Sequence, residues 1–141
     1  MIGAVWNTRG LNKAGKLKCI SDFVLENKLD FVGFQETKKE NFSGAFLKAV
    51  NPHFTWNWLP ATGTAGGILV GFREDKVEII GWQNYKFCST AVVRNINDKF
   101  VWKLCVVYGS PYEDGKREFI DELHLLSENW SGPLLIGGTS I

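Results

Sequence analysis

Changes in the period of apolar residues divide the chain into predicted elements. Residues 2–6 form a short apolar run, and residues 29–37 (LDFVGFQET) are nearly continuously apolar until Gln35, as is typical of strands buried on both faces. Between these runs, apolar residues recur at helical spacing and predict a helix over 16–27. Residues 41–50 predict a shorter helix that ends before an Asn-Pro dipeptide.

The middle of the chain has the shorter, alternating patterns of strands. Phe54, Trp56 and Trp58 alternate along one stretch, so they share one side of it. The predicted strands that follow are 68–72, 77–85, 88–96 and 100–108, of which the last three form a meander, and then come an amphipathic helix over 116–129 and a last strand over 134–136. The order β-α-β-α-β-β-β-β-α-β predicts one layered α/β domain over residues 1–141, with a mixed sheet and flanking helices.

Composition narrows the function classes. The hydrophobic fraction is 45% and the charged fraction 22%, as in ordinary globular domains, and the net charge of +1 gives no basic field that would favour nucleic acid. Three widely spaced cysteines, Cys19, Cys88 and Cys105, predict reduced, buried thiols. The sequence shows neither a signal-peptide pattern nor a membrane span, so we expect an intracellular protein, in the cytoplasm or nucleus, that is not secreted.

Several polar residues stand where predicted strands end. Asn7, Glu36 and Tyr108 each follow or end a strand, and strand ends can converge in space. A carboxylate for Mg²⁺, with an amide and a phenol for positioning, suits phosphate-ester chemistry, whereas the alternative is that the three are caps and turn residues. Gly137 and Gly138 end the last strand and predict a close approach of the backbone to a ligand.

Six segments in order resemble one known family. They are WNTRGLN, DFVGFQETK, AGGILVGF, VVYGSPY, KREFIDELHLLSENW and SGPLLIGG. Together they resemble the endonuclease domain of plant LINE-type (non-LTR) retrotransposons, which belongs to the endonuclease/exonuclease/phosphatase superfamily with the abasic-site endonucleases. The resemblance covers essentially the whole chain. It implies a four-layer α/β sandwich, with two mixed sheets face to face and helices outside, and Mg²⁺-dependent hydrolysis of phosphodiesters.

The resemblance also implies roles for individual residues. Asn7 matches the Asn of the first active-site strand, Glu36 the metal-binding Glu, and Tyr108 the Tyr that contacts the scissile phosphate. Thr139 stands where the family has the Asp that orients the attacking water, and Ile141 replaces the following Asn. The later Asp and the Ser-Asp-His of the family have no counterpart in this sequence. We therefore expect a catalytically inactive protein in which Glu36 holds Mg²⁺ weakly at best and no cofactor binds tightly.

A further expectation concerns assembly. The chain resembles the N-terminal half of the sandwich, so we expect one sheet face without a cover, on strands 68–72, 88–96 and 100–108. A homodimer or another protein would cover that face, and protein–protein interaction is the expected function. Two alternatives stay open. One is a residual nucleic-acid-binding module with a basic rim of Arg9, Lys13, Lys38 and Lys39, and the other is a Mg²⁺-dependent endonuclease completed by another chain.

Overall fold

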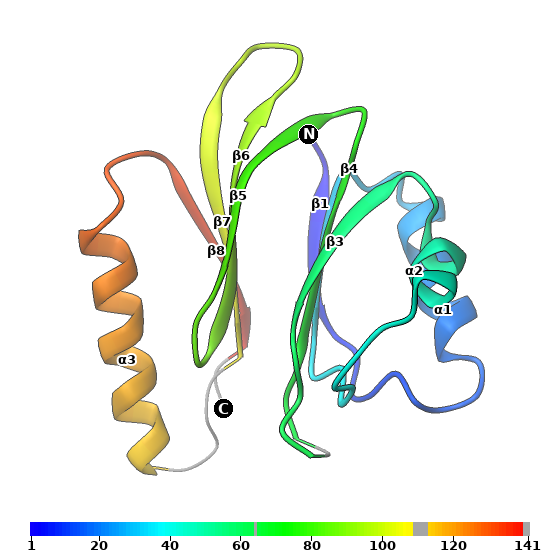
Figure 1. Ribbon diagram of the computed structural model, residues 1–141, viewed down its shortest axis with the longest axis horizontal. Coiled ribbons are helices and arrows are strands. Elements are labelled where there is room, and N and C mark those ends of the chain that lie inside the picture. Colours follow the sequence, from blue (N-terminus) through cyan, green and yellow to red (C-terminus); the bar gives the residue numbers. More distant parts are fainter. Residues whose placement is uncertain (64, 109–112, 140–141) are drawn as a thin grey trace.

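The fold is a sandwich of four layers, helix, sheet, sheet and helix, in a computed structural model that describes residues 1–63, 65–108 and 113–139 (Figure 1). In chain order the elements are β1 (Gly3–Asn7), α1 (Lys16–Glu26), β2 (Phe31–Gln35), α2 (Gly44–Val50), β3 (Phe54–Leu59), β4 (Ile68–Arg73), β5 (Val77–Asn84), β6 (Cys88–Asn95), β7 (Val101–Tyr108), α3 (Glu113–Glu128) and β8 (Leu134–Thr139). This architecture confirms the predicted layered α/β class.

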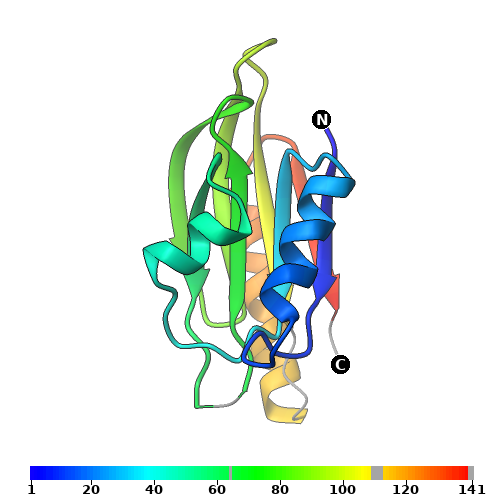
Figure 2. The same ribbon diagram turned by 90° about the vertical axis from the view of Figure 1, so that its right-hand side faces the viewer.

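Each half of the chain contributes one sheet. The described residues form two four-stranded sheets, ordered β1-β2-β4-β3 and β5-β6-β7-β8. In the first, β1 and β2 are parallel while β4 is antiparallel to both of its neighbours; in the second, β5, β6 and β7 form the predicted antiparallel meander and β8 runs parallel to β7. Helices α1 and α2 pack on the outer face of the first sheet, and α3 packs on part of the outer face of the second (Figures 1 and 2).

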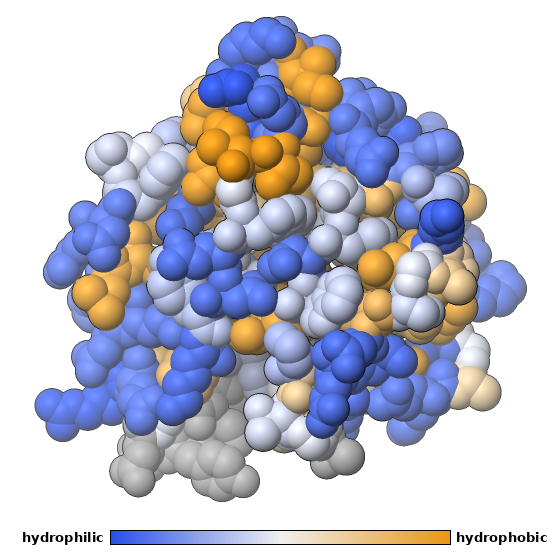
Figure 3. Space-filling model, in the orientation of Figure 1, coloured by the Kyte–Doolittle hydropathy of each residue, from blue (hydrophilic) through white to orange (hydrophobic). Residues whose placement is uncertain are grey.

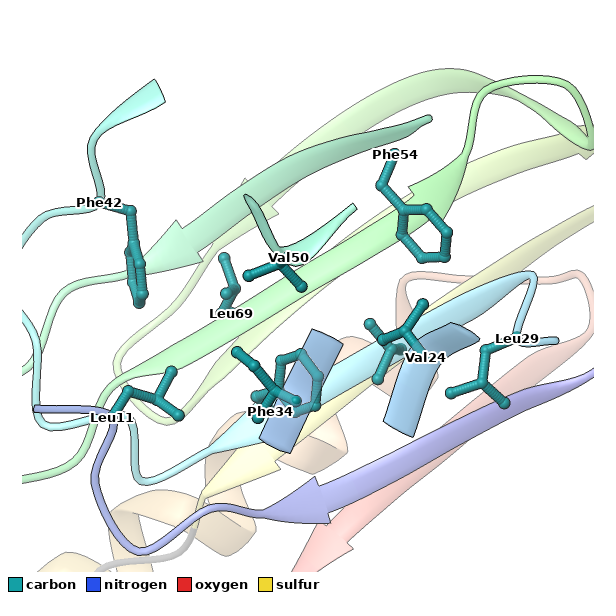
Figure 4. Close-up of a cluster of buried hydrophobic side chains, with 10 residues drawn as sticks. Leu11, Val24, Leu29, Phe34, Phe42, Val50, Phe54 and Leu69 are labelled. Atoms are coloured by element: carbon teal, nitrogen blue, oxygen red, sulfur yellow. The ribbon is translucent and has the colours of Figure 1, made fainter. Parts of the chain in front are cut away.

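Three apolar clusters hold the four layers together. The cluster between the sheets combines side chains of both, including fully buried Phe72 and Leu104. A second cluster packs α1 and α2 onto the first sheet around Phe34 and Val24 (Figure 4), and the alternating Phe54, Trp56 and Trp58 all belong to it, as predicted. The third cluster seats α3 on the second sheet. At about 25 cal/mol per Å² of buried apolar surface, these clusters dominate the stability of the fold.

The structure corrects several sequence-based expectations. The residues predicted to form one sheet with a bare face are divided between two sheets that cover each other, so the expected exposed face on β4, β6 and β7 does not exist. Residues 54–59 form a full strand, which gives five strands between α2 and α3 where four were predicted. All three cysteines are free, but Cys19 is exposed on α1, and only Cys88 and Cys105 are buried as expected.

Candidate functional site

The carboxyl ends of β1, β2 and β7 lie at the same end of the sandwich, the lower end in Figure 1. Within the first sheet, Asn7 stands opposite Gln35 in the β1–β2 register, so Glu36 follows directly beside it. In the second sheet, Tyr108 is the last residue of β7. The structure therefore places the three residues predicted from the sequence at one end, as the strand-end argument anticipated.

The loop after β2 is held in an unusual backbone conformation. Glu36 and Lys38 both adopt left-handed φ values, 53° and 57°, which are uncommon outside glycine. Backbone hydrogen bonds fix the loop on both sides, because Gly10 N donates to Glu36 O at 2.7 Å and Lys38 N donates to Gly66 O at 2.8 Å. Strained residues of this kind concentrate at functional sites, which marks this loop as the centre of the candidate site.

Glu36 interacts with one cation and one phenol. Its carboxylate lies 3.6 Å from the ammonium group of Lys38. Burial, and in addition the negative charge of Glu36, raise the pKa of the Tyr108 phenol above its usual value. The carboxylate of Glu36 thus interacts with the Tyr108 phenol of the other sheet and with the Lys38 ammonium group of its own loop.

Asn7 serves the local turn. Its side-chain Oδ1 accepts a hydrogen bond from the backbone N–H of Arg9 at 3.0 Å, a typical Asx turn. The next residue, Thr8, is buried and its hydroxyl donates to the Gln35 carbonyl at 3.0 Å. The ammonium group of Lys16, at the start of α1, donates to the Thr8 carbonyl at 2.8 Å. The hydrogen bond to Arg9 gives Asn7 a local structural role, and its part in phosphate-ester chemistry stays a prediction.

Gln35 is a site residue that sequence reasoning missed. It is fully buried at the end of β2, and its side-chain amide donates to the carbonyl of Val107 in the opposite sheet. Gly138 lies against this bond, because a Cβ atom at that position would overlap both the Gln35 amide and the Val107 carbonyl. Gly137 similarly faces the side chain of Val5. The two glycines thus allow close packing of β8 on the first sheet, which explains them without the ligand that the sequence suggested.

The remaining predicted positions are only partly described. Thr139 pairs in register with Tyr108 at the end of β8, which brings its backbone to the same end of the sandwich. Ile141 lies outside the described residues. Gln35 is a polar residue at the end of an otherwise apolar run. That exception in the pattern is the signal that could have identified its contact with Val107.

The four basic residues of the predicted rim differ in their surroundings. Lys38 faces Glu36, whereas the ammonium group of Lys39 lies over the rings of Phe42 and Phe46, 5.6 and 5.1 Å from their centroids. Arg9 and Lys13 are exposed near the same end. Two of the four cations are thus engaged by other side chains of the protein, which weakens the rim as a phosphate-binding surface.

A small pocket lies beside Tyr108, next to the candidate site. It has a volume of about 260 Å³ and a mainly apolar lining that includes Leu59, Ile68 and Phe87. Lys86 also lines it, but its ammonium group is paired with Glu118. The pocket therefore offers little charge to an anionic ligand.

The residues at this end do not fit tight Mg²⁺ binding by themselves. A Mg²⁺ site usually recruits one or two carboxylates together with substrate phosphates, and the carboxylate of Glu36 is already paired with Lys38. Across the described ranges, no three His, Cys, Asp or Glu side chains are grouped so that they could hold a metal ion. His53 and His124 are exposed and belong to no such group.

Comparisons with known proteins place this geometry in a family. Residues 4–137 match the endonuclease/exonuclease/phosphatase family, and the chain belongs to that family. No curated protein matches the sequence. Within the parts of the chain described above, no helix is both long and apolar enough to cross a membrane.

Solved structures share the fold at low sequence identity. A mannosyl-6-phosphatase of Bacteroides thetaiotaomicron aligns with a TM-score of 0.70 and 13% identity over 95% of this chain and 62% of its own. The human Nocturnin catalytic domain with bound sulfate aligns with a TM-score of 0.71 and 11% identity, over 94% of this chain and 61% of its own. An AP endonuclease of Archaeoglobus fulgidus aligns with a TM-score of 0.62 and 16% identity, over 93% of this chain and 53% of its own. The chain thus spans less than two thirds of the length of these structures.

Proposed function

We propose that this chain is a catalytically inactive member of the family, derived from the endonuclease domain of a plant LINE-type retrotransposon, and that it acts through protein–protein interaction. The observation that carries the proposal is the pairing of Glu36 with Lys38 at 3.6 Å. An ammonium group in this position competes with a metal ion for the carboxylate, and Thr139, in place of an Asp, adds no charge. A hydroxyl group does not accept a proton from water at neutral pH.

The interaction half of the proposal rests on the edges of the two sheets. The inner faces of the two sheets cover each other and helices pack on their outer faces, so the strand edges and the part of β5 around exposed Ile80 are the sheet surfaces left for a partner. One flank exposes two edge strands that carry apolar side chains and no charged residue, β1 and β8. Exposed apolar edges favour pairing with another polypeptide.

The decisive experiment is a plasmid-nicking assay with Mg²⁺ or Mn²⁺, with Glu36→Ala as the matched control. We expect no nicking by either protein, since losing one member of a cooperating catalytic set lowers rates by about 10⁴-fold or more. Metal-dependent nicking by the wild-type chain that Glu36→Ala abolishes would refute inactivity and favour a nuclease.

Nucleic-acid binding is the second candidate, supported only by the exposed Arg9 and Lys13. Fluorescence anisotropy with labelled single- and double-stranded DNA at several salt concentrations tests it. We expect weak binding with a shallow salt dependence, because few free cations face the site. Tight binding that Arg9→Ala and Lys13→Ala together remove would replace protein interaction as the proposed function.

A further inference from the structure

A cavity of about 410 Å³, called here the far-end cavity, lies at the opposite end of the sandwich from Glu36 and Tyr108. Its lining comes from the segments where α1 and α2 end, where β1 and β2 begin, and where the chain turns from β4 into β5. The N-terminus marks this end of the molecule in Figures 1 and 2. The volume lies within the range of small-molecule sites, and the function proposed above makes no use of it.

Asn51 gives the far-end cavity a hydrogen-bond donor that has no acceptor in the protein. The residue follows α2 and lines the cavity, although it is only 8% exposed. Its Oδ1 accepts a hydrogen bond from the backbone N–H of His53 at 2.8 Å, whereas its Nδ2 donates to no described residue. In the same part of the chain, Trp56 Nε1 is the only fully enclosed side-chain nitrogen or oxygen without a partner, so Asn51 Nδ2 opens to the cavity. A nearly buried amide of this kind needs an acceptor from outside the chain.

The charged residues of the far-end cavity favour an anion. Lys28, Arg73 and Lys76 line it, and neither lysine forms an ion pair with any described residue. Asp30 also lines it, but its carboxylate accepts a backbone N–H at 2.8 Å. Arg73 is held by Asp75, which accepts from its Nε at 2.9 Å and from its Nη2 at 3.1 Å. Three cations thus stand against two carboxylates, so one negative charge would balance the cluster.

The end of α1 fixes one of these cations and leaves no strong acceptor in the wall. Lys28 has a left-handed φ of 50°, and it donates its backbone N–H to the Leu25 carbonyl at 3.1 Å. Leu29 donates its backbone N–H to the Val24 carbonyl, also at 3.1 Å. This pair of bonds is a Schellman motif, in which Lys28 takes the position that glycine usually occupies. Because the carbonyl groups are engaged by the backbone, the helix end does not compete for a cation.

The rest of the lining is apolar. Val24 and Leu29 are buried and belong to the cluster beneath α1, and they form part of the wall. Ile2 and Leu25 also line the cavity, and they are 56% and 69% exposed although both are large and apolar. An apolar group in the cavity would remove part of this surface from water, which inorganic anions cannot do.

We propose that the far-end cavity binds a small organic carboxylate with an apolar body, of the class of medium-chain fatty acids. The carboxylate accepts a hydrogen bond from Asn51 Nδ2 and lies among Lys28, Arg73 and Lys76. The hydrocarbon lies against the apolar wall that includes Leu25. The donor, the charge balance and the apolar wall thus select one chemical class, and the site is independent of the candidate site at the other end.

Isothermal titration calorimetry on the full-length chain tests the proposal with octanoate as the probe. 1-Octanol supplies the same hydrocarbon without the charge, and inorganic phosphate supplies charge without hydrocarbon. We expect octanoate to bind at least about tenfold more tightly than either compound, because only octanoate uses both the donors and the apolar wall.

Two substitutions of equal charge locate the site. Asn51→Asp keeps an oxygen for the His53 N–H but replaces the Nδ2 donor with an acceptor, so it should weaken octanoate binding by about tenfold or more. Asn41→Asp is the matched control, since Asn41 is exposed and does not line the cavity. This variant should bind octanoate as the wild-type chain does.

Octanoate binding that Asn51→Asp weakens and Asn41→Asp retains supports the proposal. The proposal is overturned if octanoate does not bind, if 1-octanol or inorganic phosphate binds equally well, or if the two variants behave alike. If Asn51→Asp unfolds, chemical-shift mapping of the wild-type chain by NMR decides: octanoate should shift the amide signals of residues 24–30 and 51–53, and shifts confined to another surface refute the site. Plasmid nicking tests the proposed function separately.

Discussion

The two open flanks of the sandwich differ in the polar side chains and the charge that they carry. On the flank formed by β3 and β5, the side chain of Asn84 bridges the sheets: its Nδ2 donates to the Trp58 carbonyl at 2.8 Å, and its Oδ1 accepts from Asn57 at 2.9 Å. The β5 edge also carries an irregularity between Ile79 and Gly81 and the charge of Glu78. In Figure 3 this flank faces the viewer, and hydrophilic and intermediate colours cover much of its middle.

The opposite flank, formed by the edge strands β1 and β8 and called here the β1/β8 flank, has no comparable polar bridge at its surface among the described residues. Its link between the sheets is the buried amide of Gln35, which reaches the Val107 carbonyl from inside. The outer strands themselves are uncharged and apolar. One flank thus presents polar side chains and a charge to solvent, whereas both edge strands of the other are uncharged and unbulged, as in edges that pair with further strands.

The largest expected effect comes from filling the close contact at the β1/β8 flank. Gly138→Ala should lower the free energy of unfolding by about 3 kcal/mol, because its φ of 135° is strained for any side chain and the new Cβ would overlap the Val107 carbonyl. Gly81→Ala on β5, where a Cβ meets no atom within 4 Å, should change it by less than about 0.5 kcal/mol. Urea unfolding at one fixed protein concentration measures both, and equal effects would contradict this contrast between the flanks.

A smaller effect is expected from removing the polar bridge of the β3/β5 flank. Asn84→Ala should lower the free energy of unfolding by about 1 kcal/mol, because the two hydrogen bonds that it breaks between the sheets are exposed to solvent. Gln83→Ala, at an exposed position on the same strand, is the control and should be nearly neutral. If the bridge protects this edge, Asn84→Ala should also form larger aggregates than Gln83→Ala at high protein concentration. Equal unfolding free energies for the two variants would contradict a stabilising role of the bridge.

The smallest effect expected is a pH dependence at two tyrosines near the ends of β7 and β5, Tyr108 and Tyr85. Burial raises the pKa of both Tyr108 and Tyr85, and Glu36 adds to the effect at Tyr108 while Cys88 and Glu122 add to it at Tyr85. A raised phenol pKa means that the folded protein favours the neutral phenol. The contribution of each tyrosine to the stability of the fold is therefore complete below a pH of about 10 and is lost as the pH rises through the raised pKa.

Phenolate absorbance during an alkaline titration tests this assignment. Glu36→Gln should lower the pKa of Tyr108 without removing the contribution of burial, and it should leave Tyr85 unchanged. Tyr108→Phe identifies which transition belongs to that residue. A titration curve that Glu36→Gln does not alter would mean that the carboxylate and the phenol do not interact.

Much of the secondary structure could be predicted from the sequence, because it depends on local periodicity. The spacing of Leu17, Ile20 and Val24 predicted α1, and the structure starts that helix at Lys16 as expected. The ends of α3 and β8 were less certain: α3 begins three residues earlier than predicted and β8 ends three residues later. Strand ends depend on pairing with neighbours, which a single sequence does not contain.

The order of most elements and the presence of Asn7, Glu36 and Tyr108 at strand ends could be predicted, because those features follow from residue type and spacing. The division of the strands into two sheets that bury each other depends on long-range packing, since a buried strand has the same apolar pattern whichever layer covers it. The bond from Gln35 to Val107, the fit of Gly138 against it, and the contrast between the two flanks likewise arise from contacts between residues far apart in the chain.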